Sequence, residues 1–493
     1  MYYPSLDEFL KLSAKGNVIP VYKEINADLD TPVSAFLRIR KDDYAFLLES
    51  VEGQEKLARY SFLGSNPALV FKSKGRNIEI LYRHKRSSDK FVTKTSPLDE
   101  IESIMRDFKA VRVKGLPRFY GGLVGFMGYD TVRFFEEIPD KNPDDLGLPD
   151  AVFMLTDTIL IFDHVNHTIK IVTNIFLQNK LLSKREKTRI YNNAIKRLDS
   201  IHHEFDQTVK ESSPAVKKVK NTVISNFTKP QFEAIVRKAK EYIRNGDIIQ
   251  VVLSQRFGLK VHREPFEIYR SLRSLNPSPY MYFLKLKDMT LVGTSPEMLV
   301  RCEDGQISTR PIAGTRPRGK SDEEDKRLAT ELFNDKKERA EHLMLVDLGG
   351  NDLGWVSKTA SVKVNEFMNI EKYSHVMHLV SEVKGILDNK RYSIYDVLKA
   401  TFPAGTVSGS PKIRAMEIID DLENLRRGPY AGCVGYFSFS HNMDTCITIR
   451  TIVIKGNNAY IQAGAGIVAD SVPKNEYFES VNKAKALIEA IIK

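Results

Sequence analysis

Short runs of apolar residues mark the strands that the sequence predicts. Each run is bounded by polar or turn-forming residues, as buried strands usually are. Two of the runs flank a polar turn at 163–167, which predicts a hairpin. The predicted strands are 45–48, 121–128, 154–162, 168–172 and 248–253.

Apolar residues at spacings of three and four predict helices. The clearest helix follows Thr228, a suitable N-cap, carries Pro230 in its first turn and ends at Gly246. Another helix starts at Pro411, with Ser410 as its predicted N-cap. Strands and helices alternate irregularly, which excludes the regular βα repeat of a barrel or parallel sheet. Further helices are predicted at 184–201, 336–348 and 473–493.

A polar stretch near the middle predicts a linker. Residues 206–220 contain few large apolar side chains and include Pro214. We therefore divide the chain into a strand-rich region at 1–205, a linker at 206–221 and a second region at 222–493.

The composition is that of an ordinary globular protein. Among 493 residues, 42% are hydrophobic and 28% are charged, and no apolar run approaches the roughly 18–20 residues of a membrane span. No targeting segment is evident, so we expect a cytoplasmic protein that binds no membrane. The net charge of +11 raises nucleic-acid binding as an alternative. Basic and acidic residues are interspersed, however, and no nucleic-acid-binding motif is recognisable, so we expect no nucleic-acid partner.

The cysteines indicate neither a disulfide framework nor a zinc site. Cys302, Cys433 and Cys446 are odd in number, widely spaced and without a CxxC pair. We expect buried free thiols.

Two pairs of glutamates are the most informative candidates for chemistry. Glu338 and Glu341 lie three residues apart in one predicted helix, and Glu476 and Glu479 do so in another. Residues at this spacing share a helical face. Two such faces opposite one another would suit Mg²⁺, which keeps several waters and takes few protein carboxylates. The spacing alone is also common on solvent-exposed helices.

Two glycine-containing turns are candidates for binding an anion. The segment 401–412 leads into a helix N-terminus, where free N–H groups bind carboxylates well. The segment 463–468 contains Gly464 and Gly466, which would let the backbone approach a ligand closely. Each segment on its own is also consistent with an ordinary turn.

A set of motifs in order resembles the chorismate-utilising enzymes. It covers the whole second region, and the first region resembles the amino-terminal part of anthranilate synthase large subunits through LLES (47–50), RYSFLG (59–64) and GGLVGFMGYD (121–130). The motifs of the second region are GDIIQVVLSQRF (246–257), GTSPEMLVR (293–301), TRPIAGTRPRG (309–319), AEHLMLVDL (340–348), YSHVMHLVSEV (373–383), TFPAGTVSGSPK (401–412), GPYAGCVGYFS (428–438), ITIRT (447–451) and GAGIVADSVPKNEY (464–477).

The resemblance implies an α+β fold of large, mostly antiparallel sheets packed in a sandwich with helices outside. It implies Mg²⁺ as cofactor and chorismate as substrate. Glu341 and Glu479 match direct metal ligands, and Glu338 and Glu476 match carboxylates that hold the metal's waters.

The resemblance also implies the residues around the substrate. Glu297 matches the general acid for the departing ring hydroxyl, so we expect burial and nearby carboxylates to raise its pKa. His378 is a candidate for proton handling. Arg450, Tyr430 and the backbone at Gly466 match the groups that hold the enolpyruvyl carboxylate. The other residues that match positions around the substrate are Gln250, Ala313, Gly314, Thr315, Thr406 and Gly464.

Two positions separate close relatives. Relatives that add water usually carry lysine at the position of Gln250, and relatives that make aminodeoxychorismate carry it at that of Ala313. Neither residue here offers a lysine base or nucleophile. The resemblance therefore implies direct attack by ammonia, release of pyruvate and anthranilate as product. Ammonia would come from a separate glutamine amidotransferase subunit, so we expect a hetero-oligomer.

Two segments resemble the tryptophan feedback site of these enzymes. They supply Glu49 and Ser50 on one side and Pro279, Tyr280 and Met281 on the other. Glu49 would pair with the ligand ammonium, and the other segment would form an apolar wall for indole.

The chain departs from the family pattern where arginine is usual. Gly350 and Trp355 stand at those positions, after the helix that carries Glu341. One enzyme alternative is aminodeoxyisochorismate synthase, which would share Gln250 and Ala313 and stops before pyruvate leaves. Another is aminodeoxychorismate synthase, which would require another route round the missing lysine.

Overall fold

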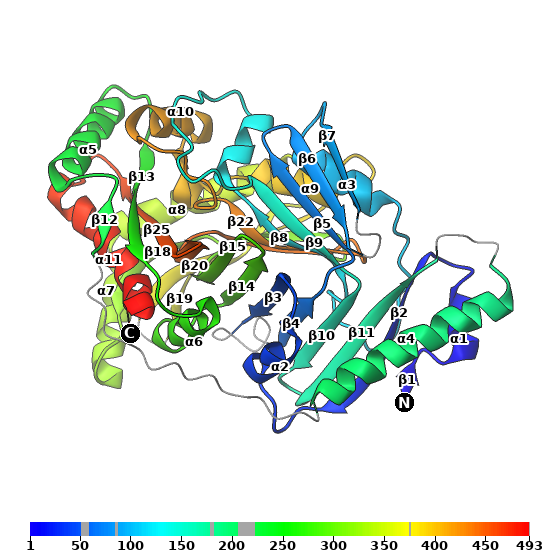
Figure 1. Cartoon of the computed structure of the whole chain (residues 1–493). Coiled ribbons are helices and arrows are strands. Elements are labelled where there is room, and N and C mark those ends of the chain that lie inside the picture. Colours follow the sequence, from blue (N-terminus) through cyan, green and yellow to red (C-terminus); the bar gives the residue numbers. More distant parts are fainter. Residues whose placement is uncertain (51–58, 84–86, 178–181, 206–221, 374–375, 493) are drawn as a thin grey trace.

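Two large antiparallel sheets form the framework of the computed structural model (Figure 1). The structure describes residues 1–50, 59–83, 87–177, 182–205, 222–373 and 376–492. The predicted linker at 206–221 lies outside these residues. None of the described helices combines the length and apolar character that a membrane crossing requires.

The first sheet draws strands from both sides of the linker. In spatial order its strands are β1 (Tyr2–Tyr3), β2 (Val18–Asn26), β11 (Thr168–Phe176), β10 (Thr158–Asp163), β4 (Tyr60–Ser65), β3 (Tyr44–Glu49), β14 (Tyr280–Leu286), β15 (Met289–Ser295), β24 (Thr451–Lys455), β25 (Asn458–Ile467), β13 (Gln250–Lys260) and β12 (Ile224–Ser225), with β21 (Gly409–Ser410) also paired to β13.

The second sheet is built in the same way. Its strands are β18 (Ile312–Pro317), β20 (Val376–Ile386), β17 (Gln306–Thr309), β16 (Met298–Glu303), β23 (Met443–Ile447), β22 (Cys433–Ser438), β8 (Gly122–Met127), β9 (Ala151–Thr156), β5 (Leu69–Lys74), β6 (Asn77–Tyr82) and β7 (Ser87–Val92), with β19 (Lys363–Lys372) also paired to β20. The chain on either side of the linker therefore contributes to both sheets.

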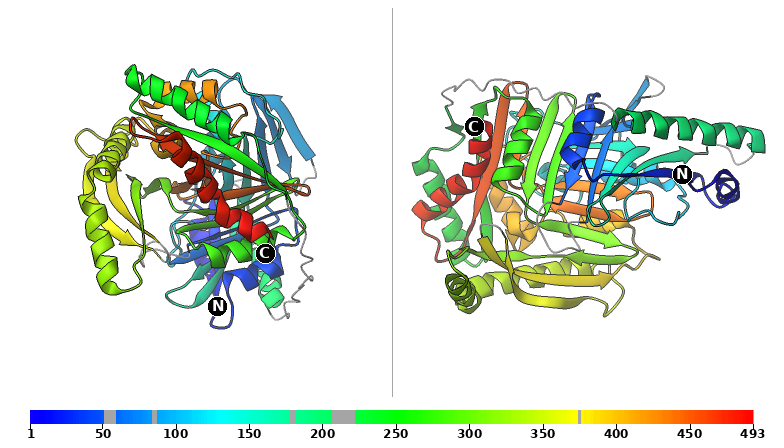
Figure 2. Two further views of the ribbon diagram at one scale, coloured as in Figure 1. Left: turned by 90° about the vertical axis from the view of Figure 1, so that its left-hand side faces the viewer. Right: turned by 90° about the horizontal axis from the view of Figure 1, so that it is seen from below.

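Helices cover the outer faces of the sandwich (Figure 2). They are α1 (Leu6–Leu12), α2 (Pro32–Ile39), α3 (Pro97–Arg106), α4 (Lys184–Phe205), α5 (Lys229–Arg244), α6 (Pro265–Leu275), α7 (Asp322–Asn334), α8 (Lys336–Gly354), α9 (Ile394–Thr401), α10 (Lys412–Leu422) and α11 (Pro473–Ile492), with 3-10 turns η1 (Tyr129–Phe134) and η2 (Gly405–Val407).

The largest apolar core lies between the sheets and contains residues of both, such as Phe62 and Phe126. A second core lies between the first sheet and α2, α4, α6 and α11, with Phe36, Tyr269 and Leu487 among its members. The expected α+β sandwich with outer helices is thus confirmed.

The predicted strand at 154–162 is wrong in one respect, because the chain changes sheet at Asp157. β9 ends at Thr156 in the second sheet and β10 begins at Thr158 in the first. The Asp157 carboxylate is buried and accepts a hydrogen bond of 2.7 Å from Arg197 of α4. The predicted hairpin with β11 is confirmed.

The predicted cap of α10 is also wrong. Ser410 lies in β21, where it pairs with Gln250 and its carbonyl accepts the Ile249 N–H. Pro411 is therefore the N-cap, and no side chain caps the helix. By contrast, Thr228 is the N-cap of α5 as predicted, and the Gln231 side chain accepts its backbone N–H.

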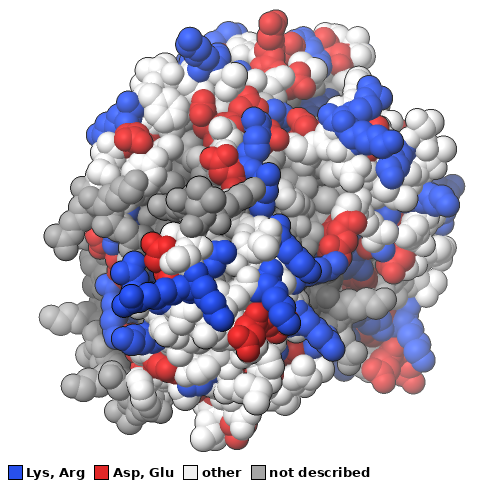
Figure 3. All heavy atoms as spheres, turned by 90° about the vertical axis from the view of Figure 1, so that its right-hand side faces the viewer, with Lys and Arg blue, Asp and Glu red and all other residues white. Residues whose placement is uncertain are grey.

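Charged residues are mixed over the face that α4 covers. Figure 3 shows basic side chains lying among acidic ones on this side of the molecule. Asp199 of α4, for example, forms an ion pair of 3.0 Å with Lys23. This mixture does not provide the uniformly basic surface that nucleic-acid binding favours.

Candidate functional site

One cavity of about 510 Å³ lies between α8, at the edge of the second sheet, and α11, on the first. We call it the chorismate cavity, after the substrate that the motifs imply. It collects every predicted substrate, metal and catalytic residue except His378. These residues are Gln250, Glu297, Ala313, Gly314, Thr315, Glu338, Glu341, Thr406, Tyr430, Arg450, Gly464, Gly466, Glu476 and Glu479.

The four glutamates enter this cavity from two helices. Asp335 begins α8 by accepting the N–H of Glu338, so Glu338 and Glu341 lie in its first turns. Glu476 and Glu479 occupy the first two turns of α11. Burial raises the pKa of Glu341, and the charges of Glu338 and Glu479 raise it further. The carboxylates of the two helices are therefore close enough to repel one another.

Three basic groups offset this negative charge. Lys483, one turn beyond Glu479, forms an ion pair of 2.8 Å with it and donates to the Gly464 carbonyl at 3.0 Å. Arg316 contacts Glu338 at 3.3 Å, and Lys337 also lines the cavity.

Two of these groups are lysines, Lys337 and Lys483, and neither stands at the position of Gln250 or Ala313. The spacing of four residues from Glu479 was the signal that could have revealed Lys483.

The donor set fits a divalent cation. Glutamate oxygens are the ligands that Mg²⁺ prefers, and a cation would relieve the repulsion that raises the pKa of Glu341. Among the described residues, no three His, Cys, Asp or Glu side chains converge tightly enough to hold an ion as they stand.

Glu297 is a buried acid at the cavity wall. It follows β15 through Ser295 and Pro296, and only 7% of its surface is exposed. Burial raises its pKa to about 8, while Thr406 and Lys483 oppose the rise. The predicted rise is confirmed, but burial causes it and the expected nearby carboxylates do not contribute. At neutral pH this carboxyl group is therefore protonated and able to donate.

Two glycines of β25 bring the backbone to the cavity surface. A Cβ at Gly464 would lie 2.6 Å from the Leu253 carbonyl oxygen, and one at Gly466 would lie 2.7 Å from Nε2 of Gln250. Both distances are too short for a side chain. The wall consequently requires glycine at 464, where the close neighbour is backbone, whereas a side chain at 466 would displace the Gln250 amide.

Polar groups without a protein partner face the same space. Oε1 of Gln250 and Oγ1 of Thr406 are buried and accept or donate no hydrogen bond of ordinary geometry. Buried polar atoms are rarely left unpaired. Oε1 of Gln250 is therefore available to a bound ligand, whereas the Thr406 hydroxyl lies against Glu297 and lowers its pKa.

Arg450 supplies the positive charge opposite the glutamates. Burial lowers its pKa, while the charge of Glu479 counteracts this. Its guanidinium donates to the Lys483 carbonyl at 3.4 Å, and its backbone adopts a φ of 51°. This single long hydrogen bond leaves most of its donors for a ligand carboxylate.

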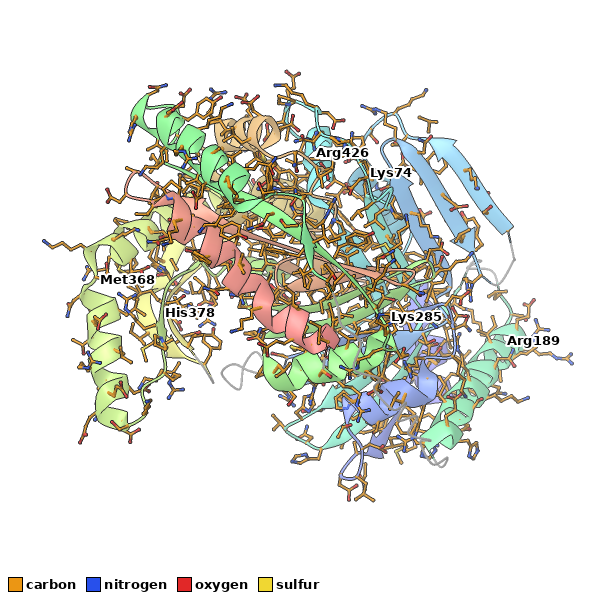
Figure 4. All side chains as sticks on the ribbon, turned by 60° about the vertical axis from the view of Figure 1, so that its left-hand side comes forward. Lys74, Arg189, Lys285, Met368, His378 and Arg426 are labelled. Carbon is orange, nitrogen blue, oxygen red and sulfur yellow. The ribbon has the colours of Figure 1, made fainter. Side chains whose placement is uncertain are left out.

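His378 lies behind the cavity wall. It sits on β20, among the yellow strands between the yellow-green helices and α11 in Figure 4. Nδ1 contacts the Gly314 carbonyl at 2.9 Å and the Thr315 hydroxyl at 3.1 Å. These contacts hold the segment that lines the cavity, so its predicted role in proton transfer stays a prediction.

A second cavity, which we call the inhibitor cavity, lies between the two sheets. Its lining includes all the predicted residues, Glu49, Ser50, Pro279, Tyr280 and Met281. It also contains Asp444, which sequence reasoning missed. That carboxylate accepts hydrogen bonds from Tyr280, Arg301 and Arg118 at 3.0, 2.9 and 3.1 Å.

Glu49 is already engaged in this structure. Its carboxylate accepts hydrogen bonds from Tyr269 and, at 3.1 Å, from Arg273, both on α6. Asp444 is therefore a second acid of this cavity, and like Glu49 it is already held by neighbouring side chains.

Comparisons with known proteins place the whole chain in one family. The family model described as chorismate binding enzyme matches residues 43–489. Anthranilate synthase component 1 of Acetivibrio thermocellus is 50% identical over 100% of this chain and 99% of its own length. That of Aquifex aeolicus is 51% identical over 99% and 97%.

Solved structures show the same fold. Anthranilate synthase component I from Streptococcus pneumoniae superposes with a TM-score of 0.76 at 39% identity, covering 94% of this chain and 98% of that one. MenF, the menaquinone-specific isochorismate synthase from Escherichia coli, superposes with a TM-score of 0.70 over 99% of both chains. At 19% identity this second likeness concerns the fold alone.

Proposed function

The chain belongs to the chorismate-binding enzymes, among them to the component 1 chains of anthranilate synthase, and on this premise we propose how its cavity makes anthranilate. One observation carries the proposal. A single cavity unites four glutamates, a protonated buried acid and an arginine. The reaction converts chorismate and ammonia into anthranilate, pyruvate and water.

Substrate binding uses opposite walls of the cavity. Arg450, Tyr430 and the backbone N–H of Gly466 hold the enolpyruvyl carboxylate, for which the fork of arginine is well suited. Glu341 and Glu479 would hold Mg²⁺ directly, and Glu338 and Glu476 would hold its waters. When bound, the ion acts as a Lewis acid toward the ring carboxylate.

Amination needs an acid on one side of the ring. Glu297 donates its proton to the departing ring hydroxyl, which leaves as water while ammonia forms the new carbon–nitrogen bond. Loss of a ring proton then breaks the bond between the ring carbon and the ether oxygen and makes the ring aromatic. The enolpyruvyl group leaves and gains a proton on its methylene carbon, which gives pyruvate. His378, through the segment it holds, is the candidate that supports this proton loss.

The nucleophile is ammonia and not a side chain. Gln250 and Ala313 stand where relatives carry lysine, and Lys483 is held by Glu479 and the Gly464 carbonyl. The free carbonyl oxygen of Gln250 is positioned to accept a hydrogen bond from the incoming ammonia.

Glutamine hydrolysis requires a second chain. All three cysteines are buried, and burial raises the pKa of Cys302 to about 11 and that of Cys433 to about 12. The thiolate needed for nucleophilic attack is therefore scarce near neutral pH. A glutamine amidotransferase partner supplies the ammonia in the proposed assembly.

The inhibitor cavity binds tryptophan in this proposal. Pro279 and Met281 offer apolar contact to indole, and Glu49 or Asp444 offers a carboxylate to the ammonium group. A Ser50→Phe variant should fill the cavity and lose tryptophan inhibition. A variant that stayed fully tryptophan-sensitive would contradict this assignment.

The reaction is tested with the purified chain alone, mixed with chorismate, Mg²⁺ and ammonium at alkaline pH. Anthranilate fluorescence and an equal amount of pyruvate are the expected products. Accumulation of an aminated cyclohexadiene without pyruvate would instead identify an aminodeoxyisochorismate synthase. Failure to consume chorismate would contradict the proposed chemistry.

A further inference from the structure

We propose that Thr294 is a positioning residue that couples the inhibitor cavity to Arg450 in the chorismate cavity. The inference rests on the proposed function, because it gives the tryptophan site a route to the substrate. Thr294 lies in β15 and is fully buried. It forms hydrogen bonds with Asn276, which leads to the inhibitor cavity, and with Arg450, which lines the chorismate cavity.

Thr294 joins the two cavities through two hydrogen bonds. Its hydroxyl donates to the Asn276 carbonyl at 2.5 Å, and its backbone N–H donates to the Arg450 carbonyl at 3.1 Å. Thr294 is also the β-sheet partner of Met281, which lines the inhibitor cavity. One residue thus touches both the segment that borders the inhibitor and the arginine that binds the substrate.

The Asn276 side of this bridge leads directly into the inhibitor cavity. α6 ends at Asn276, and the next residues run through Pro277 to Pro279 and Tyr280 in the cavity wall. Proline fixes φ and limits how such a segment can absorb displacement. A ligand that pushes on Pro279 or Tyr280 will therefore move the Asn276 carbonyl.

The Arg450 side is sensitive to such a movement. A φ of 51° is unusual for a residue with a side chain and persists where the surroundings hold it in place. The N–H of Thr294 is one of the groups that hold it, because it fixes the Arg450 carbonyl. Displacement of Thr294 would therefore change where the guanidinium meets the substrate carboxylate.

A separate contact leads from the inhibitor cavity to the general acid. Cys446 lines that cavity, and the N–H of the next residue, Ile447, donates to the Glu297 carbonyl at 3.1 Å. This route would affect proton donation and hence kcat. The Thr294 route ends at substrate binding, so its signature is a change in KM.

The test compares Thr294→Val with Thr294→Ser in the ammonia-dependent reaction of the full chain. Valine keeps the shape and removes the hydroxyl, whereas serine retains the hydroxyl. We expect valine to raise KM for chorismate about tenfold while kcat changes less than about twofold. The factor by which saturating tryptophan raises KM, typically about 5–150 for allosteric coupling, should fall toward one. Serine should restore both values.

Matched controls make each outcome decisive. Thr290→Val changes the same residue type at the other end of β15 and should behave as wild type. Thr294→Ala, which introduces no new methyl contact, replaces valine if thermal melts show that the valine variant is unfolded. Unchanged KM and unchanged tryptophan inhibition in the variant without a hydroxyl would overturn the inference. Failure of serine to restore them would also overturn it.

Failure of the proposed function has a different result. Wild-type chain that makes no anthranilate would contradict the proposed reaction, and wild-type chain that tryptophan does not inhibit would contradict the inhibitor site. Wild-type inhibition that persists equally in Thr294→Val contradicts only the coupling.

Discussion

Single residues in the chorismate cavity are held in states that an exposed residue would not adopt. Glu297 keeps its proton at neutral pH because burial disfavours the charged form. Burial likewise raises the pKa of Glu341, and the charges of Glu338 and Glu479 raise it further. These states are useful for catalysis and binding, and they carry a cost in stability.

Replacing Glu297 by glutamine should separate activity from stability. Loss of the proton donor should lower kcat by about 10²–10⁴-fold. In wild type, kcat should fall as pH rises through about 8, measured at a fixed concentration of free ammonia. A variant with nearly normal kcat would contradict the assigned role.

The same substitution should raise thermal stability at high pH. The folded chain keeps the Glu297 proton up to about pH 8, whereas the unfolded chain releases it near pH 4.5. Between these values the folded state binds more protons, so its stability falls as pH rises. Thermal melts should show Glu297→Gln above wild type at pH 8–9, with the difference shrinking toward pH 5. No pH dependence of this difference would argue against a buried, protonated Glu297.

A side chain at Gly466 should displace Gln250 from the chorismate cavity. A Cβ there would press on the Gln250 amide at 2.7 Å, whereas one at Gly258, on the neighbouring strand, would meet its nearest atom at 3.8 Å. We expect Gly466→Ala to raise KM for chorismate at least tenfold and Gly258→Ala to leave it within about twofold. Chorismate titrations of both variants measure this, and equal effects would refute the close approach of β25 to the substrate.

At the scale of elements, the site depends on where α8 and α11 begin. The Asp335 cap and the start of α11 at Pro473 place two glutamates of each helix on its cavity side. The helices and glutamate pairs could be predicted from spacing. Their meeting could not, because it depends on the packing of two sheets.

Local sequence patterns did not predict the ends of strands and helices at positions where tertiary contacts determine them. The run 154–162 reads as one strand, and only the buried pair of Asp157 and Arg197 marks the change of sheet. Ser410 has the chemistry of an N-cap, but pairing with β13 holds it in a strand. The roles of Glu297 and Arg450 were inferred from resemblance, since no periodicity distinguishes them.

Gly350 of α8 should be replaceable with a gain in stability. It lies inside the helix, has no positive φ, and a Cβ there would meet nothing within 4 Å. Alanine is favoured over glycine in a helix by about 1 kcal/mol. Urea unfolding should show Gly350→Ala more stable by roughly this amount, with unchanged kcat. Lower stability would indicate a constraint on this face of α8.

At the scale of the whole molecule, the two sheets bring together segments that are distant in sequence. Glu341 lies on α8, which packs at the edge of the second sheet, and Glu479 lies on α11, which packs on the first sheet. The cavity therefore exists only when the two sheets are packed together. The expected fold and family are confirmed by the topology and the comparisons. The division at 206–221 remains a prediction, and strands from both sides of it share both sheets.

The most direct test of the account follows anthranilate formation as Mg²⁺ is removed by a chelator and restored by titration. Wild-type chain and an exposed-carboxylate control, Glu323→Ala, should recover saturable activity. Glu341→Ala and Glu479→Ala, each shown to be folded by thermal melts, should stay inactive at every Mg²⁺ concentration. Activity that survives chelation, or that persists in either of the two variants, would contradict a cation site shared by α8 and α11.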